Sequence, residues 1–111
     1  MKRRAIDPEK SADSAETGLC KALLAMHDVA EMRAFLHDLC TPAELEALVD
    51  RWTVVPHVLK GMPYRQIHEH TAVSITTIGR VARFLNQGSG GYRKAAARVL
   101  QRGHGPREQR A

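Results

Sequence analysis

The sequence contains few aromatic residues and few cysteines, and it has no long hydrophobic run. Its 111 residues include one Trp, two Tyr, two Phe and two cysteines, and Cys20 and Cys40 form no CxxC pair. Neither a cysteine-based zinc site nor a thiol redox motif is therefore predicted, and we expect both cysteines to be reduced core thiols. No apolar stretch approaches the ~18 residues that cross a bilayer, and Lys2 to Arg4 lead into polar sequence rather than into a signal peptide. The sequence predicts a cytoplasmic protein without a membrane partner.

The combinations of residues that catalysis requires are also missing. At 111 residues the chain has room for one small domain, which excludes a multidomain enzyme. His68, Glu69 and His70 are adjacent, but no nucleophile, phosphate-binding glycine loop or paired carboxylates accompany them. The two histidines lie on different helical faces, which is not a metal pattern. We therefore predict no enzymatic activity, no metal and no cofactor.

Acidic residues are scarce in the second half of the chain. Residues 1–50 carry a net charge of −4, whereas residues 51–111 carry +9 and contain only Glu69 and Glu108 as acids. A basic half joined to an acidic half suggests a polyanion as the partner of the second half. The six Lys and Arg residues from Arg93 to Arg110, like those from Lys2 to Arg4, are either solvated or follow a DNA backbone.

No segment alternates apolar and polar residues as a strand does, so the predicted class is all-α. We predict three parts: a flexible arm over residues 1–14, a helical dimerisation and helix-turn-helix domain over 15–88, and a basic flexible tail over 89–111, in which Tyr92–Gln101 is a candidate for one more helix. Pro56 lies inside the longest apolar stripe, so we expect a kink or two helices there. Apolar residues recur with helical spacing in the segments 19–26, 29–39, 42–59, 64–71 and 74–85.

The segment from Arg65 to Leu85 has the spacing of a helix-turn-helix. Ile67 and Thr71 on the first helix and Ile78 and Val81 on the second are predicted to face the core, with Ala72-Val73 at the turn. Two residues depart from the usual motif, because His68 stands at a position that is usually small and Ala72 where glycine is favoured. Short hydroxyls and arginines near a helix N-terminus suit the major groove. The exposed part of the second helix is then predicted to be Ser74, Ile75, Thr76, Thr77, Gly79, Arg80 and Arg83.

Taken in order, these segments resemble the Trp repressor superfamily, and most closely its YerC/YecD branch. The superfamily is matched by Leu39-Cys40-Thr41-Pro42-Ala43-Glu44-Leu45-Glu46-Ala47-Leu48, Arg51, Lys60-Gly61 and Thr76-Thr77-Ile78-Gly79-Arg80. The branch is matched by Tyr64-Arg65-Gln66-Ile67, Arg80-Val81-Ala82-Arg83-Phe84-Leu85 and Gly88-Ser89-Gly90-Gly91-Tyr92. The resemblance covers residues 19–93 and implies a bacterial, intertwined all-helical homodimer that binds DNA as a transcriptional regulator.

The resemblance also implies roles for single residues. Arg65 matches a backbone-contacting arginine, Ile75, Thr76 and Thr77 match the base-facing start of the recognition helix, and His68 and Gly79 match contact positions with changed chemistry. Possible effector-binding residues are Thr41, Arg51 and Arg80, which match positions that hold tryptophan in Trp repressor. Val81 and Phe84 stand where the family has glycine and serine, and their bulk argues against tryptophan binding and makes any small-molecule effector a minor expectation.

The predicted function is therefore a sequence-specific DNA-binding transcriptional regulator, acting as a repressor. A short helix-turn-helix touches few base pairs, so two symmetric half-sites in a palindromic operator are expected to supply the specificity. The alternative is a dimeric helical protein-interaction module that has lost specific DNA binding and uses its acidic first half.

Overall fold

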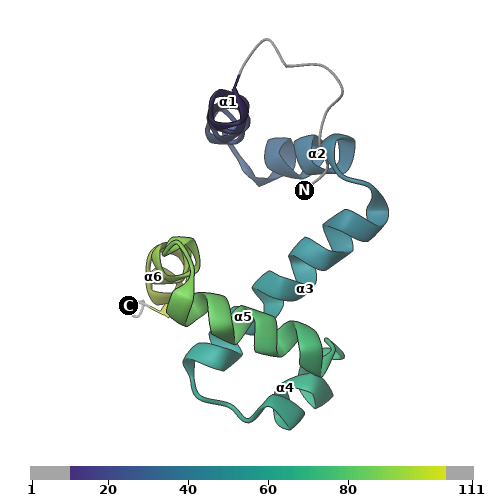
Figure 1. Ribbon diagram of the computed structural model, residues 1–111, viewed down its shortest axis with the longest axis vertical. Helices are drawn as coiled ribbons and strands as arrows, with labels where there is room; N and C mark the ends of the chain where they lie inside the picture. Colours follow the sequence, from purple (N-terminus) through teal and green to yellow (C-terminus); the bar gives the residue numbers. More distant parts are fainter. Residues whose placement is uncertain (1–10, 105–111) are drawn as a thin grey trace. The chain divides into compact units, whose positions relative to one another are not determined.

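The computed structural model describes residues 11–104, with the side chains of residues 11–100, and this part of the chain consists of helices and their connections (Figure 1). It contains no strand, which confirms the all-α prediction. None of the helices within 11–104 has the length and hydrophobicity needed to cross a membrane. The chain divides into two compact units at the start of α3. The helices are α1 (Ala12–Leu24), α2 (Val29–Leu39), α3 (Pro42–Leu59), α4 (Tyr64–Thr71), α5 (Ile75–Gln87) and α6 (Gly91–His104).

Side-chain caps set the helix boundaries of the first unit. The Ser11 hydroxyl accepts a hydrogen bond from the N–H of Ser14, so α1 begins at Ala12, inside the arm predicted over residues 1–14. Residues 1–10 of that arm lie outside the described residues. Asp28 accepts from the N–H of Glu31 at 2.8 Å, and the Glu31 carboxylate accepts from the N–H of His27 at 2.8 Å. This reciprocal pair is a capping-box variant that starts α2 where the sequence predicted it.

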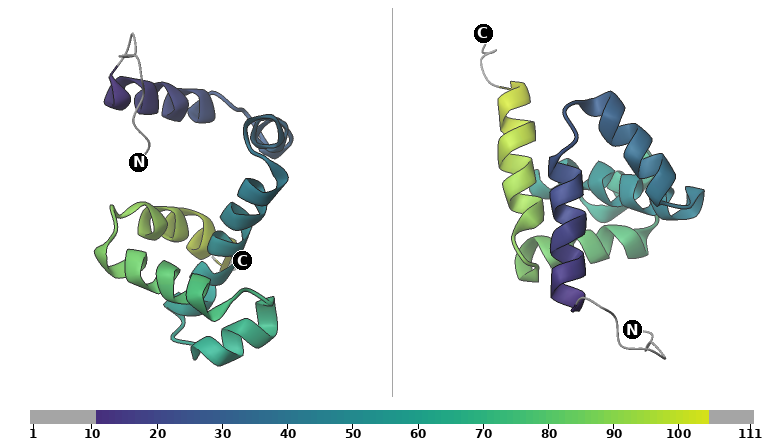
Figure 2. Two further views of the ribbon diagram at one scale, coloured as in Figure 1. Left: turned by 45° about the vertical axis from the view of Figure 1, so that its right-hand side comes forward. Right: turned by 90° about the horizontal axis from the view of Figure 1, so that it is seen from above.

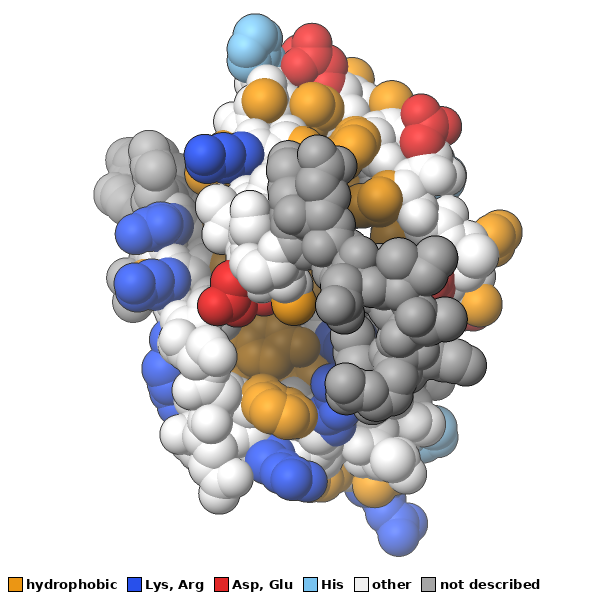
Figure 3. Space-filling model, turned by 45° about the horizontal axis from the view of Figure 1, so that its top comes forward, with side chains coloured by type: hydrophobic (Ala, Val, Ile, Leu, Met, Phe, Trp, Pro, Cys, Tyr) orange, Lys and Arg blue, Asp and Glu red, His pale blue; other side chains and the backbone are white. Residues whose placement is uncertain are grey.

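The apolar residues of α1 and α2 are not buried by the rest of their own unit. Neither helix contains a buried residue, and Leu24 and Val29 remain 84% and 73% exposed. Hydrophobic side chains, orange in Figure 3, accordingly stand at the surface. The expectation of core thiols is wrong, because Cys20 is exposed and Cys40 is only half-buried, although both are free cysteines. The sequence correctly marks these stripes as apolar, but a single chain does not cover them.

The second unit has a core built from the end of α3 and from α4, α5 and α6 (Figure 2). Ile67, Ile78 and Val81 are fully buried, as the helix-turn-helix spacing predicted. Together the buried side chains fix the directions of all four helices, and so determine which face of α5 is turned outward. The core consists of Val54, Val55, Ile67, Val73, Ile78, Val81, Leu85 and Ala96.

Helix α3 runs through Pro56 as one element, so of the two predicted alternatives, a kink or two helices, the second is wrong. Proline removes one backbone hydrogen bond from a helix interior. The two residues before it, Val54 and Val55, are fully buried and anchor the helix beside the missing bond. The helix ends where the N–H of Met62 bonds to the carbonyl of His57. Burial thus outweighs the local preference of proline to end a helix.

The folded part of the second unit extends beyond residue 88, where the sequence predicted the end of the domain. Helix α6 occupies Gly91–His104, and its Ala96 is 5% exposed within the core. The helix considered for Tyr92–Gln101 therefore exists, and the description of residues 89–104 as a tail is wrong. Residues 105–111 lie outside the described residues. The sequence signal was weak because three consecutive alanines supply little of the apolar pattern.

The turn between α4 and α5 places an alanine in a left-handed backbone conformation. Ala72 has φ 65°, and its N–H bonds to the carbonyl of His68 at 2.8 Å. An L-residue in this region costs roughly 1–2 kcal/mol, and glycine avoids that cost but loses more chain entropy on folding. We expect Ala72→Gly to raise the free energy of unfolding by about 0.5–1 kcal/mol, as measured by urea denaturation. A loss of stability would show that the Ala72 methyl group contributes packing that its exposed position does not suggest.

Candidate nucleic-acid interface

Helices α4 and α5 and their connection form the helix-turn-helix that the sequence predicted. Ile67 from α4, Val73 from the turn and Ile78 from α5 are buried together, at 0%, 4% and 0% exposure. Because these three residues belong to one buried cluster, they hold α4 and α5 in a fixed arrangement across the three-residue connection. The outward face of α5 is therefore presented by a rigid frame.

The turn itself is closed by side chains of α4. The Thr71 hydroxyl donates to the carbonyl of Ile67 at 2.8 Å and accepts from the N–H of Val73 at 3.1 Å. His68 Nδ1 donates to the carbonyl of Val73 across 2.8 Å. The imidazole therefore bridges the turn rather than crowding it, which explains how histidine fits where the motif usually has a small residue. When neutral, this imidazole leaves Nε2 as a hydrogen-bond acceptor.

Ser74 forms the N-cap of α5 and organises its first turn. Its hydroxyl accepts from the N–H of Thr77 at 3.1 Å and donates to the Thr77 hydroxyl at 3.0 Å. Ile75 is 47% exposed, Thr76 is exposed and Thr77 is half-buried. The predicted base-facing residues therefore do lie together at the open N-terminus of α5. Ser74 is engaged in the cap, so its contribution to a contact would be to position Thr77.

The other predicted contact residues surround this first turn. Arg65 and Arg83 are exposed. Gly79 is half-buried, and a methyl group built on it would have the edge of the Tyr64 ring as its nearest neighbour at 3.9 Å, an ordinary contact. No steric conflict within the second unit therefore requires glycine at this position. A glycine inside a helix costs about 1 kcal/mol relative to alanine.

The charges of this region favour an anionic partner. Glu69 is the only acidic residue from Arg51 to His104, and neither α4 nor α5 has an acid in its first turn. Helix N-termini carry partial positive charge that acidic side chains ordinarily neutralise. Arg65 adds a further positive charge to the first turn of α4, which the helix dipole disfavours. The positive potential around the helix-turn-helix is thus left for an external anion.

Two of the three possible effector residues meet in one pocket. Arg51 of α3 and Arg80 of α5 line an open pocket of about 400 Å³, together with Phe84 and residues 88–92. Phe84 forms part of the wall of this pocket, whereas Val81 is fully buried in the core and does not line it. Thr41 belongs to the other unit.

An aromatic contact on α5 was not predicted from the sequence. The Arg80 guanidinium carbon lies 4.9 Å from the centre of the Phe84 ring, and that of Arg83 lies 5.7 Å from it. Both are cation–π contacts, worth about 0.5–1 kcal/mol at exposed sites. The four-residue spacing of Arg80 and Phe84 was the available signal, since such residues are neighbours on a helix surface.

Comparison with known proteins agrees with this architecture. The family model described as Trp repressor protein matches residues 16–100. The chain is 37% identical over 83 residues to the Bacillus subtilis protein YerC, covering 75% of this chain and 80% of YerC. It is similar to the crystal structure of a TrpR-like protein from Eubacterium eligens, with a TM-score of 0.73 and 34% identity over 78% of this chain and 90% of that one. The chain therefore belongs to the Trp repressor family, in its YerC-like branch.

Proposed function

We propose that the protein is a transcriptional repressor that binds double-stranded DNA in a sequence-specific way through α5. The observation that carries this proposal is the first turn of α5, where Ile75 and Thr76 are exposed on a helix fixed by fully buried residues. Methyl groups and hydroxyls at a helix N-terminus can read base edges in the major groove. Arg65 and Arg83 flank this turn in sequence and are proposed to contact phosphates, and His68 Nε2 and the half-buried Gly79 are proposed to complete the contact surface.

We also propose that the protein acts as a homodimer. The apolar side chains of α1 and α2 and the first half of α3 are open in one chain, with Leu48 and Val49 44% and 54% exposed. A second copy supplies matching apolar surface without a new partner. Two recognition helices about one DNA turn apart, ~34 Å, would then read a palindromic operator.

Tryptophan is not proposed as the effector. Arg80 packs over the Phe84 ring, at the position where the family resemblance places a serine that helps hold the amino acid. Arg80, one of the side chains that could recognise a ligand, is therefore already engaged with a neighbour in the same helix.

The proposed roles of Arg65 and Thr77 predict different responses to mutation. Arg65→Ala should weaken binding to every duplex about equally. It should also make the slope of log K against log salt concentration less steep, by about 0.9 for each phosphate that the arginine neutralises. Thr77→Ala should instead change base preference by about 1 kcal/mol or more at one position of each half-site. Fluorescence anisotropy with duplexes selected from a random library measures both, and the same selection defines the operator.

The outcomes also separate this function from the alternative of a protein-interaction module. Equal affinity of the unmodified protein for selected and scrambled duplexes would contradict sequence-specific binding. Early elution from a DNA column at low salt would contradict DNA binding altogether and favour the alternative. Identical effects of Arg65→Ala and Thr77→Ala would contradict the division between phosphate and base contacts.

A further inference from the structure

The Tyr64 ring lies on the outward face of α5, although Tyr64 belongs to α4. Gly79 lies one helical turn after Ile75 and one turn before Arg83, so these three residues share one face of α5. Ile75 and Arg83 are exposed on this face. A methyl group built on Gly79 would have Tyr64 Cε2 as its nearest neighbour, at 3.9 Å. The ring therefore lies beside the first turns of α5, on the side that carries the proposed base-reading residues.

The packing of α4 holds this ring in place. The N–H of Ile67 bonds to the carbonyl of Pro63 at 3.0 Å, which closes the first turn of α4 around Tyr64. Ile67 itself is fully buried in the core. Because α4 cannot rotate without removing Ile67 from the core, the direction in which Tyr64 leaves the helix is fixed as well. Tyr64 is thus presented by the same rigid frame as the first turn of α5.

The Tyr64 hydroxyl is available to a partner outside the chain. Tyr64 is 43% exposed, and within residues 11–100 its hydroxyl makes no hydrogen bond. A phenolic hydroxyl can donate a hydrogen bond to a phosphate oxygen. Tyrosine is among the side chains through which proteins contact the DNA backbone. The fold therefore places an unused hydrogen-bond donor next to the helix that is proposed to enter the major groove.

We propose that Tyr64 is a further DNA-contacting residue, whose hydroxyl donates a hydrogen bond to a backbone phosphate beside the bases that α5 reads. This inference rests on the proposed function, because it requires that α5 enters the major groove of a duplex. Gly79 lies about 6 Å further along α5 than Ile75, so the ring stands beside and beyond the base-reading turn. A phosphate contact there fixes the orientation of α5 on the duplex and carries no sequence information.

Tyr64→Phe tests this contact, because it removes the hydroxyl and keeps the ring. The variant should bind about tenfold more weakly to selected and scrambled duplexes alike, since a hydrogen bond to a charged group is lost. The slope of log K against log salt concentration should not change, because a neutral hydroxyl releases no counterions. This result would distinguish Tyr64 from Arg65, whose removal is expected to change the slope. The free energy of unfolding in urea should stay the same.

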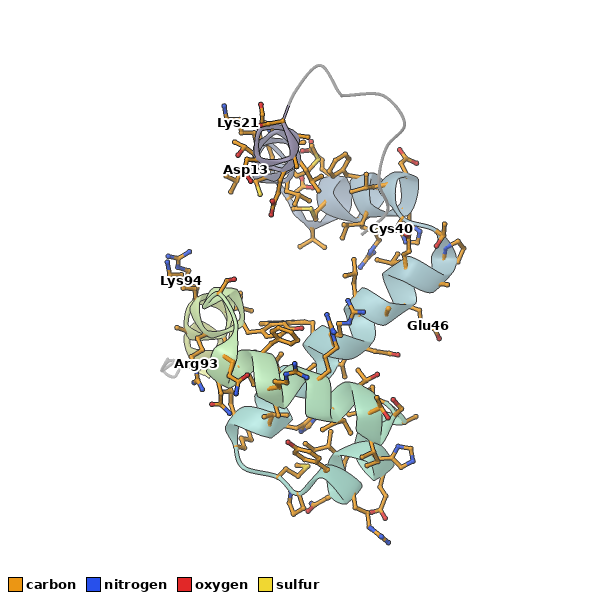
Figure 4. All side chains as sticks on the ribbon, viewed as in Figure 1. Asp13, Lys21, Cys40, Glu46, Arg93 and Lys94 are labelled. Atoms are coloured by element: carbon orange, nitrogen blue, oxygen red, sulfur yellow. The ribbon has the colours of Figure 1, made fainter. Side chains whose placement is uncertain are left out.

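Tyr92→Phe is the matched control, because it removes the same group from the other tyrosine of the chain. Tyr92 packs against the core at the start of α6, beyond the C-terminal end of α5, where Figure 4 labels its neighbours Arg93 and Lys94. This variant should bind DNA as the unmodified protein does. An equal loss of affinity in the two variants would overturn the proposal, since the position of Tyr64 would then not explain its effect.

Methylphosphonate substitution, which neutralises one phosphate of a duplex at a time, locates the contact. One substituted position in each half-site should weaken binding by the unmodified protein but should not weaken Tyr64→Phe any further. Unchanged affinity of Tyr64→Phe would overturn the proposal. A changed preference at one base pair would also overturn it, by assigning the hydroxyl to a base edge, and so would a loss of stability, by assigning it to the fold. The proposed function fails by a different result, the absence of sequence preference in the unmodified protein.

Discussion

Replacing Ile78 by alanine is expected to lower the free energy of unfolding by about 3 kcal/mol. Ile78 is fully buried between α4, the turn and the rest of the core, so truncation removes buried methyl groups and leaves a cavity. The loss is a large part of the roughly 5–15 kcal/mol that typically stabilises a domain. Urea denaturation should show a lower midpoint concentration, with an unchanged slope of the unfolding free energy against urea concentration. Intact protein at low temperature should still bind DNA, because Ile78 does not reach the surface.

Ile75→Ala provides a matched control, because it makes the same chemical change one helical turn earlier. Ile75 is 47% exposed, so its truncation should change stability by less than about 0.5 kcal/mol. It should instead weaken binding to selected duplexes by about 1 kcal/mol, roughly fivefold, if its methyl groups contact a base. Equal destabilisation by the two variants would mean that the start of α5 is buried in an assembly and is not open for DNA.

The helix-turn-helix could be predicted from sequence because its contacts are local. Ile67, Ile78 and Val81 are separated by few residues, and the spacing of two short helices and a turn places them on facing sides. The capping signals at Asp28 and Ser74 are equally local, since each cap bonds to a residue three positions ahead. Predictions of this kind need little information about residues outside the segment.

The parts that the sequence left open depend on distant partners. Pro56 stays inside a continuous helix because Val54 and Val55 pack against other helices. Helix α6 is held by burial of Ala96, a residue too small to mark an apolar stripe. In each case packing across the second unit decides between structures that the local pattern allows equally.

Placing a charge on the apolar stripe of α1 is expected to separate the proposed dimer. Leu19 is 41% exposed in one chain, and Leu19→Asp would place a carboxylate where the partner's apolar surface is proposed to lie. Each of the two copies would lose about 1.5 kcal/mol or more of free energy from apolar burial. This loss raises the dissociation constant of the dimer about 100-fold or more. Analytical ultracentrifugation should give twice 12.3 kDa for the unmodified protein and a monomer for the variant at micromolar concentration.

Ser14→Asp is the control, because it adds the same charge to the same helix. Ser14 and Leu19 are about 140° apart around the axis, and Ser14 is exposed. This variant should remain dimeric and keep its DNA affinity. Leu19→Asp should lose most of its affinity for a palindromic duplex but keep the affinity for one half-site, since α5 belongs to the other unit. A Leu19→Asp variant that stays dimeric would assign the interface to another surface, and an unmodified protein that is monomeric would remove the dimer and the palindrome together.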